Sequence, residues 1–151
     1  MNEAILILKL DSENIKHFIE LIGVFEDVFE MKNFAVPDAE YLLQLLKKDN
    51  FHVFVALYDN NVVGGLTAYT LSAYYSESST VYIYDLAVKT EFQRQGIGKM
   101  LILNINNYCK SIGVKEVFVQ ADLEDDYAID FYKSTGGLPE NVIHFTYSLN
   151  Q

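Results

Sequence analysis

The fold of this chain is decided by the stretch Val81-Tyr82-Ile83-Tyr84-Asp85-Leu86-Ala87-Val88, which runs on into Gln93-Arg94-Gln95-Gly96-Ile97-Gly98-Lys99. The first segment is rich in β-branched and aromatic residues, which is typical of a buried β-strand. The second segment places two glycines in a tight turn and predicts a long helix from Gly96 to about Ser111. The sequence therefore predicts a strand, a turn and a helix in direct succession.

The start of that helix is a candidate anion site. The first N–H groups of a helix have no partner within the helix, and the macrodipole adds partial positive charge there. Gly96 and Gly98 let the backbone curl and let a ligand approach without meeting a Cβ atom. We expect a phosphate or pyrophosphate at this turn. The glycine spacing alone does not distinguish such a site from an ordinary strand–turn–helix corner.

Outward from this stretch, the periodicity predicts one α/β domain over residues 1–151 with a mixed, mainly antiparallel sheet flanked by helices. The strand at 81–88 and the strand at 116–121 are expected to be parallel neighbours, joined by a right-handed crossover through the long helix. The carboxyl ends of this central pair are expected to splay apart. Further strands are predicted at 4–10, 51–58, 62–71 and 141–147, and further helices at 12–29, 38–46 and around 128–132.

Composition narrows the function. The chain has 151 residues, half of them hydrophobic, and a net charge of −10 from 21 acidic and 11 basic side chains. Such a surface repels nucleic acid and anionic membranes and attracts polycations, although solubility alone also explains it. Cys109 is the single cysteine and the three histidines share no ligand spacing, so we expect neither a disulfide nor a metal site. The apolar start at 4–8 is too short for a signal peptide, which favours a cytoplasmic location.

The second half of the chain carries a resemblance. The order strand, Q-x-x-G-x-G, helix, strand and A-x-x-F-Y-x-x-x-G, the last at 128–136, resembles the GNAT superfamily of acetyl-coenzyme A-dependent N-acetyltransferases. Within that superfamily the chain is most similar to the type I aminoglycoside 3-N-acetyltransferases. The matching segments extend from the Phe25 region to Phe145 and are 82–88, 119–122, 125–126 and 142–145.

The resemblance implies acetyl-coenzyme A as the cofactor and coenzyme A as the product. It also places the pantetheine arm in the splay of the parallel strands. Asp125 lies where the superfamily usually has an asparagine that touches the cofactor, so this contact is in question. The implied cofactor-binding residues are Leu86, Ala87, Val88, Gln93, Arg94, Gln95, Gly96, Ile97, Gly98, Lys99, Asp125, Ala128 and Tyr132.

Acetyl transfer needs a neutral amine, and neutralising an alkyl amine of pKa near 10 at pH 7 costs roughly 4 kcal/mol. Asp85 is the candidate base, acting directly or through water; the alternative is a buried aspartate paired with a backbone N–H or an arginine. Many family members carry a glutamate at the position of Tyr84, and its absence here shifts the base role to Asp85 or to water. The resemblance assigns Tyr132 as the acid that protonates the leaving thiolate; the alternative is a core aromatic residue.

Acidic residues gather in two segments. The loop at 122–126 packs four carboxylates into five positions, and a further acidic edge lies on the first helix. These side chains would suit an acceptor with several ammonium groups, as the acidic loop of the type I enzymes does; the alternative is a capped helix and solvated faces. The candidate substrate-binding residues are Glu26, Asp27, Glu30, Tyr84, Asp85, Asp122, Glu124 and Asp126.

Three functions remain open on these observations. The first is transfer of acetyl to the 3-amino group of an aminoglycoside by direct attack in a ternary complex. The second is a related acetyltransferase for a polyamine, another small amine or a protein amine. The third is an acyl-coenzyme A sensor, against which the presence of Tyr132 argues. A Rossmann-type nucleotide domain is disfavoured because the first strand lacks its motif. The tyrosine- and phenylalanine-rich surface would permit a homodimer.

Overall fold

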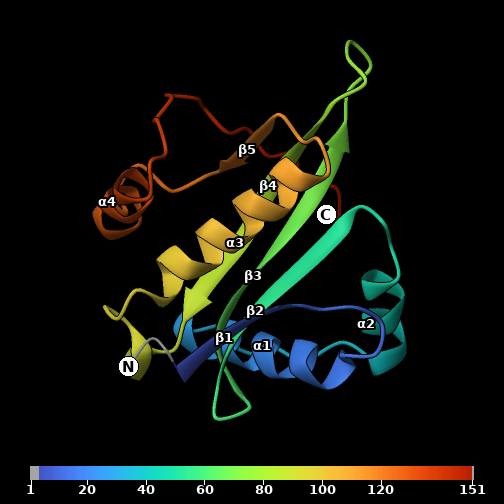
Figure 1. Cartoon of the computed structure of the whole chain (residues 1–151), viewed down its shortest axis with the longest axis vertical. Coiled ribbons are helices and arrows are strands. Elements are labelled where there is room, and N and C mark those ends of the chain that lie inside the picture. Colours follow the sequence, from blue (N-terminus) through green and yellow to red (C-terminus); the bar gives the residue numbers. More distant parts are fainter. Residues whose placement is uncertain (1–3, 151) are drawn as a thin grey trace. The chain divides into compact units, whose positions relative to one another are not determined.

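A mixed five-stranded sheet forms the core of the first part of the chain (Figure 1). The computed structural model describes residues 4–150, and the chain divides into two units, Met1–Gln120 and Ala121–Gln151, each of which is described by itself. The first unit contains β1 (Ile5–Lys9), α1 (Ile15–Val28), α2 (Ala39–Leu46), β2 (Phe51–Tyr58), β3 (Asn61–Ser72), β4 (Ser79–Val88), the short 3₁₀ helix η2 (Thr90–Phe92), α3 (Ile97–Ser111) and β5 (Glu116–Val119). The second unit contains α4 (Asp126–Ser134).

The strand order confirms the predicted fold class. The strands follow one another as β1-β2-β3-β4-β5; the first three neighbouring pairs are antiparallel, and β4 and β5 are parallel. Helix α3 connects the two parallel strands, because parallel neighbours cannot be joined by a short hairpin. Residues 81–99 thus supply most of β4, the turn and the start of α3, which are the elements around the candidate site.

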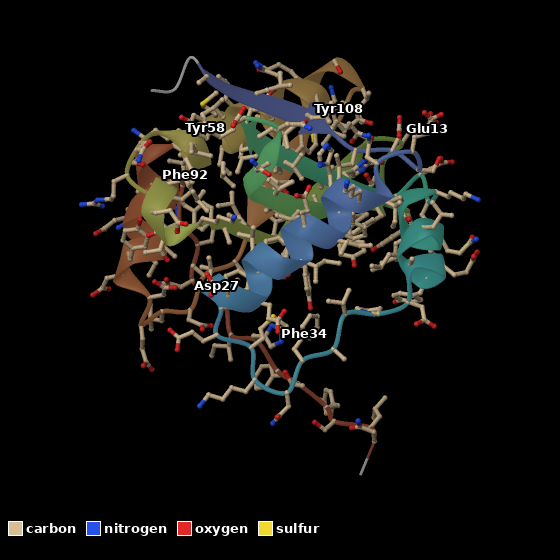
Figure 2. The ribbon with its side chains drawn as sticks, turned by 90° about the horizontal axis from the view of Figure 1, so that it is seen from below. Glu13, Asp27, Phe34, Tyr58, Phe92 and Tyr108 are labelled. Carbon is tan, nitrogen blue, oxygen red and sulfur yellow. The ribbon has the colours of Figure 1, made fainter. Side chains whose placement is uncertain are left out.

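The two faces of the sheet are covered by different helices. On β2, Phe51, Val53 and Val55 pack into the hydrophobic core beneath α1 and α2. The alternate residues His52 and Phe54 contact the ring of Tyr108 on α3, at 5.7 and 5.9 Å between ring centroids. Successive side chains of a strand point to opposite faces, so α1 and α3 lie on opposite sides of the sheet. Figure 1 shows α3 across one face, and Figure 2 views the sheet from the side of α1.

Helix α1 approaches the sheet most closely where β3 has two glycines. A Cβ atom added at Gly65 would lie 2.6 Å from the Leu21 side chain and 2.6 Å from the Phe54 carbonyl oxygen. At Gly64, a Cβ atom would lie 2.9 Å from the carbonyl oxygen of Ala87 on β4. These glycines are therefore required by close packing, and a bulge in the pairing of β2 with β3 lies beside Gly64.

A β-bulge interrupts the pairing of β3 with β4. Thr67 lies opposite Asp85 and Ala68 lies opposite Ile83, so Tyr84 is the extra residue of β4. An extra residue breaks the strict alternation of side chains along a strand and bends the strand locally. As a result, the side chains on either side of the bulge do not follow the pattern that the sequence alone predicts.

The sequence prediction is wrong for two strands near the end of the chain. The strand expected at 116–121 ends at Val119. The final strand expected at 141–147 is absent from the described structure, in which the second unit has one helix and no strand. Alternating apolar residues favour an extended chain, but a strand also needs a neighbour for its backbone hydrogen bonds. Among residues 4–150, no helix is long and apolar enough to cross a membrane.

Candidate active site

The parallel strands part before β4 ends. Their pairing stops at Ile83 opposite Val119, while β4 continues to Val88. The edge of β4 that faces away from β3 therefore has no strand partner beyond Ile83 within the described chain. Backbone N–H and C=O groups on such an edge can bond an extended ligand in the way a strand would. This opening contains Leu86, Ala87 and Val88, the residues assigned to the pantetheine arm by resemblance.

The turn that follows folds back onto the end of β4. The Gln93 side-chain amide donates a hydrogen bond of 2.8 Å to the carbonyl oxygen of Val88. Arg94 and Gly96 adopt left-handed conformations, with φ of 64° and 85°, and α3 begins at Ile97. A non-glycine residue at positive φ is uncommon and is often found at functional turns. The turn and the open end of β4 are thus held together by Gln93.

The start of α3 has the chemistry of an anion site. Gly96 occupies the cap position and has no side chain to accept the first N–H groups of the helix. These N–H groups, the helix macrodipole and the charge of Lys99 in the first turn all favour a bound anion. The residues of this turn therefore fit the pyrophosphate of coenzyme A.

The two glutamines of the turn differ in their surroundings. The Gln93 amide is committed to Val88, so Gln93 shapes the turn through its own side chain. The side-chain oxygen of Gln95 is buried and lacks a hydrogen-bond donor among the described residues, while its amide lies 3.5 Å from the Glu91 carbonyl oxygen. A buried acceptor without a donor is costly, so Gln95 is the residue of the turn whose bonding is incomplete.

Asp85 lies in the opening with its carboxylate unpaired. The side chain is half-buried, and burial raises its pKa above the ordinary value of 3.8. No hydrogen bond or ion pair reaches this carboxylate from any residue between 4 and 150, which removes the arginine or backbone partner that the sequence left open. An ionisable group with a raised pKa and no partner is typical of a site for a cation or a proton.

The bulge brings Tyr84 to the same side of the sheet as Asp85. Asp85 lies opposite Thr67 of β3. Thr67 and Gly65 share the face of β3 that lies against Leu21 of α1. The Tyr84 ring contacts the ring of Tyr69, which belongs to the same face because it packs against the core beneath α1. Consecutive residues would otherwise point to opposite faces.

The acidic edge of α1 lies at its C-terminal end. Glu26, Asp27 and Glu30 line an open concavity of about 430 Å³ together with Gly23 and Met31. Figure 2 labels Asp27 at this end of the helix and Glu13 before the other end. Helix α1 packs on β3 and β4, the strands that carry the Tyr84 bulge. Three carboxylates at one helix end favour a cationic ligand by charge alone.

In the second unit, Asp125 caps α4. Its carboxylate accepts a hydrogen bond of 3.1 Å from the Ala128 N–H, and Asp126 lies in the first turn. This confirms the expectation that one aspartate of the acidic loop caps the short helix. The cap occupies one oxygen of Asp125 and fixes the backbone of Ala128. Asp122 and Glu124 are exposed residues of the same loop.

Tyr132 lies in the last turn of α4. Its ring meets that of Phe131 at 5.1 Å between ring centroids, and both side chains are partly exposed. This packing orients the Tyr132 ring and is compatible with a hydroxyl that acts on a ligand. Among residues 4–150, no group of three or more histidine, cysteine, aspartate or glutamate side chains is arranged to hold a metal ion.

Sequence reasoning missed the aromatic residues around Tyr84. Tyr82 and Phe118 stack at 4.7 Å with an interplanar angle of 7°, and Tyr69 and Tyr82 both meet the Tyr84 ring. The density of tyrosine in the β4 stretch was a signal, but regular alternation would place Asp85 on the face opposite to Tyr82 and Tyr84. The bulge could not be placed from the sequence.

The parted end of the parallel pair offers backbone groups to an extended ligand, the turn before α3 has N–H groups that suit an anion, and the Asp85 carboxylate lies close to both in the chain. The sequence matches the model of the acetyltransferase (GNAT) family over residues 18–136. The chain therefore belongs to the GNAT family of acetyltransferases, enzymes that use acetyl-coenzyme A.

Solved structures give the same classification. The chain is similar to an aminoglycoside acetyltransferase, meta-AAC0020, from an uncultured soil metagenomic sample, whose structures were solved in complex with sisomicin and with trehalose. The identities are 53% and 54%, with 99% of each chain covered and a TM-score of 0.97 in both comparisons. A second aminoglycoside acetyltransferase from such a sample, HMB0005, is 33% identical over 97% of this chain and 99% of its own, with a TM-score of 0.91.

A more distant structure shows the fold alone. The aminoglycoside N-acetyltransferase AAC(6')-Iy in complex with CoA is 18% identical, covers 96% of this chain and 95% of its own, and has a TM-score of 0.76. Comparison with curated protein sequences gives no significant match.

Proposed function

We propose that this protein transfers acetyl from acetyl-coenzyme A to the 3-amino group of an aminoglycoside, by direct attack within a ternary complex. The observation that carries the proposal is the half-buried Asp85 carboxylate, which has no partner in the described chain and lies where the parallel strands part. The sisomicin complex of the relative that is 53% identical supports an aminoglycoside as the acceptor. The choice of the 3-amino group rests on the resemblance to the type I enzymes.

The proposed role of Asp85 is to hold the acceptor ammonium and to take its proton as the amine attacks, directly or through one water molecule. A carboxylate with a raised pKa is a better proton acceptor than an ordinary aspartate. The missing partner supports this role, because an aspartate already paired with arginine would have a lowered pKa and less affinity for a second cation.

The proposed role of Tyr132 is to return a proton to the leaving group. When bound, acetyl-coenzyme A supplies the thioester carbon that the amine attacks and the thiolate that leaves. A phenol of ordinary pKa near 10 can protonate a thiolate of similar basicity. The Tyr132 ring contacts the ring of Phe131 and is only partly exposed.

The cofactor would bind along the free edge of β4 and at the start of α3. Leu86, Ala87 and Val88 would bond the pantetheine arm with backbone groups, and the N–H groups at Gly96, Ile97, Gly98 and Lys99 would bind the pyrophosphate. We propose that Arg94 and Gln95 also bind the cofactor at this turn and that Gln93 holds the turn in shape. Asp125 and Ala128, at the start of α4, are the remaining cofactor-binding candidates. Holding both substrates in one complex supplies much of the acceleration without a special residue.

The acidic side chains would bind the remaining ammonium groups of the acceptor. The candidates are Glu26, Asp27 and Glu30 on α1 and Asp122, Glu124 and Asp126 before and at α4. The net charge of −10 supports a polycationic acceptor. We further propose that residues 1–151 act as one cytoplasmic domain, that homodimers form, and that nucleic acids and membranes are not partners.

The proposal is tested by measuring thiol release from acetyl-coenzyme A with gentamicin, kanamycin, spermidine and a lysine peptide offered separately. Fast turnover with the two aminoglycosides, with the acetyl group on the 3-amino nitrogen by NMR, is the expected result. Turnover with spermidine or the peptide alone would show that the protein is an acetyltransferase with a different acceptor. Tight binding of the cofactor with no turnover of any acceptor would contradict the proposal.

A further inference from the structure

Four aromatic side chains form a continuous wall on the face of β3, β4 and β5 that also carries α1. The wall consists of Tyr69, Tyr82, Tyr84 and Phe118. Tyr82 stacks on Phe118 at 4.7 Å, and Tyr84 meets Tyr82 and Tyr69 edge to face, each at 5.8 Å between ring centroids. The Tyr82 hydroxyl donates to the side-chain oxygen of Gln120 at 2.9 Å, which fixes that ring from its other end.

Tyr84 is the exposed member of this wall. Its relative exposure is 58%, while Tyr69, Tyr82 and Phe118 are only partly exposed. The neighbouring rings stand at 87° and 81° to it, so neither of them stacks flat on the Tyr84 ring. A ring held in this way loses little conformational entropy when a ligand covers it.

The bulge sets the ring beside the unpaired carboxylate. Because Tyr84 is the extra residue of β4, Tyr84 and Asp85 project on one side of the sheet although they are consecutive. The site therefore combines a flat apolar surface with an adjacent anionic oxygen. A ligand with an apolar C–H face next to an amino group would satisfy both.

We propose that Tyr84 is a specificity-determining residue that stacks on the aminocyclitol ring whose amine is held by Asp85. The proposal rests on the proposed function and deepens it. Sugar and aminocyclitol rings with equatorial substituents present axial C–H bonds on each face of the ring, and such a face packs on an aromatic ring. An acyclic polyamine offers no such face, so the wall selects cyclic amines among cations of equal charge.

The test compares Tyr84→Leu with Tyr84→Phe, with kanamycin as acceptor. Tyr84→Leu removes the ring and should raise the KM for kanamycin about 5- to 10-fold, while Tyr84→Phe keeps the ring and should stay within about twofold of the unchanged protein. The KM for acetyl-coenzyme A should not change in either variant. Tyr74→Leu is the matched control, because Tyr74 is 98% exposed and lies outside the wall.

A binding measurement supplies the second readout. Kanamycin protons that stack on an aromatic ring move upfield in its NMR spectrum, and the shift should appear with the unchanged protein and Tyr84→Phe and disappear with Tyr84→Leu. Thermal unfolding of each variant identifies a loss that comes from misfolding alone. The NMR measurement decides the stacking even for a variant with low turnover.

The two proposals can fail separately. Acetylation of kanamycin with equal KM in Tyr84→Leu and the unchanged protein would overturn the stacking and would still support the proposed acetyltransferase function. Upfield shifts of kanamycin without any acetylation would overturn the proposed function and keep the stacking. A loss as large in Tyr84→Phe as in Tyr84→Leu would assign the effect to the hydroxyl and would overturn the role of the ring.

Discussion

At the scale of single residues, Asp85 shows how a strand residue becomes a reactive one. Its neighbours Ile83 and Ala87 are buried in the apolar layers of the sheet, and Asp85 itself is half-buried, with no hydrogen bond or ion pair from residues 4–150. Burial disfavours the charged carboxylate, so the folded protein binds its proton more tightly than the unfolded chain does. Such an arrangement reduces stability at neutral pH and is expected where a ligand supplies the missing positive charge.

We predict opposite effects of Asp85→Asn on activity and stability. The amide accepts no proton, so kcat should fall about 100-fold or more, and the acidic limb of the pH profile of kcat/KM should vanish. Because the folded pKa is raised, stability is lost as pH rises through it, and the amide should raise the melting temperature at pH 7. This gain should disappear below the ordinary pKa of 3.8, where both states are protonated.

The measurements are steady-state kinetics from about pH 5 to 9 and thermal unfolding over a wider pH range. Asp59→Asn is a suitable control, because Asp59 lies in the exposed turn between β2 and β3. An unchanged kcat in Asp85→Asn would assign proton removal to water alone.

At the scale of elements, the turn before α3 allows a matched test of the anion site. Gly96 and Gly113 flank the same helix with nearly equal φ of 85° and 84°, and alanine at either position costs about 1–2 kcal/mol of backbone strain. Gly96→Ala should raise the KM for acetyl-coenzyme A several-fold, because Gly96 shapes the turn that binds the pyrophosphate. Gly113→Ala should lower stability similarly and leave that KM unchanged. Equal effects of the two variants on that KM would contradict the proposal that this turn binds the pyrophosphate.

The contact of α1 with β3 makes a second prediction at this scale. The Cβ atom of Gly65→Ala would overlap the Leu21 side chain and the Phe54 carbonyl oxygen, both at 2.6 Å. Because one of these neighbours is backbone, we expect a loss of about 1–3 kcal/mol or more in the free energy of unfolding. Gly23→Ala is the control, since a Cβ atom there meets nothing within 4 Å and alanine favours a helix. Denaturant unfolding measures both, and a Gly65→Ala protein as stable as the unchanged one would contradict this packing.

At the scale of the whole molecule, the excess of acidic side chains should guide the acceptor. With a net charge of −10, the protein attracts a polycation over distances that salt screens. We predict that kcat/KM for kanamycin falls at least several-fold between about 20 and 500 mM NaCl, while the KM for anionic acetyl-coenzyme A does not rise. A salt-independent kcat/KM for kanamycin would show that the charge serves solubility alone.

Much of the fold could be predicted from the sequence because its signals are local. The apolar periodicity placed β2, β4 and α3 within one or two residues, and the succession strand–turn–helix at residues 81–111 predicted the parallel pair. The prediction was wrong at 141–147, where alternation alone cannot supply a hydrogen-bonding neighbour. It also left open whether Asp85 has a partner, since that depends on every segment folded around it.

The sequence by itself determined the order of the elements, the glycine turn at the start of α3, and the acidic character of the chain. Periodicity, turn chemistry and charge act between residues that are close in sequence or simply add up along it. Only the tertiary structure decided that Asp85 is unpaired, that Tyr84 bulges from β4, and that four aromatic rings from three strands form one wall. Those features arise from strand pairing and from contacts between residues far apart in the chain, and no local pattern contains them.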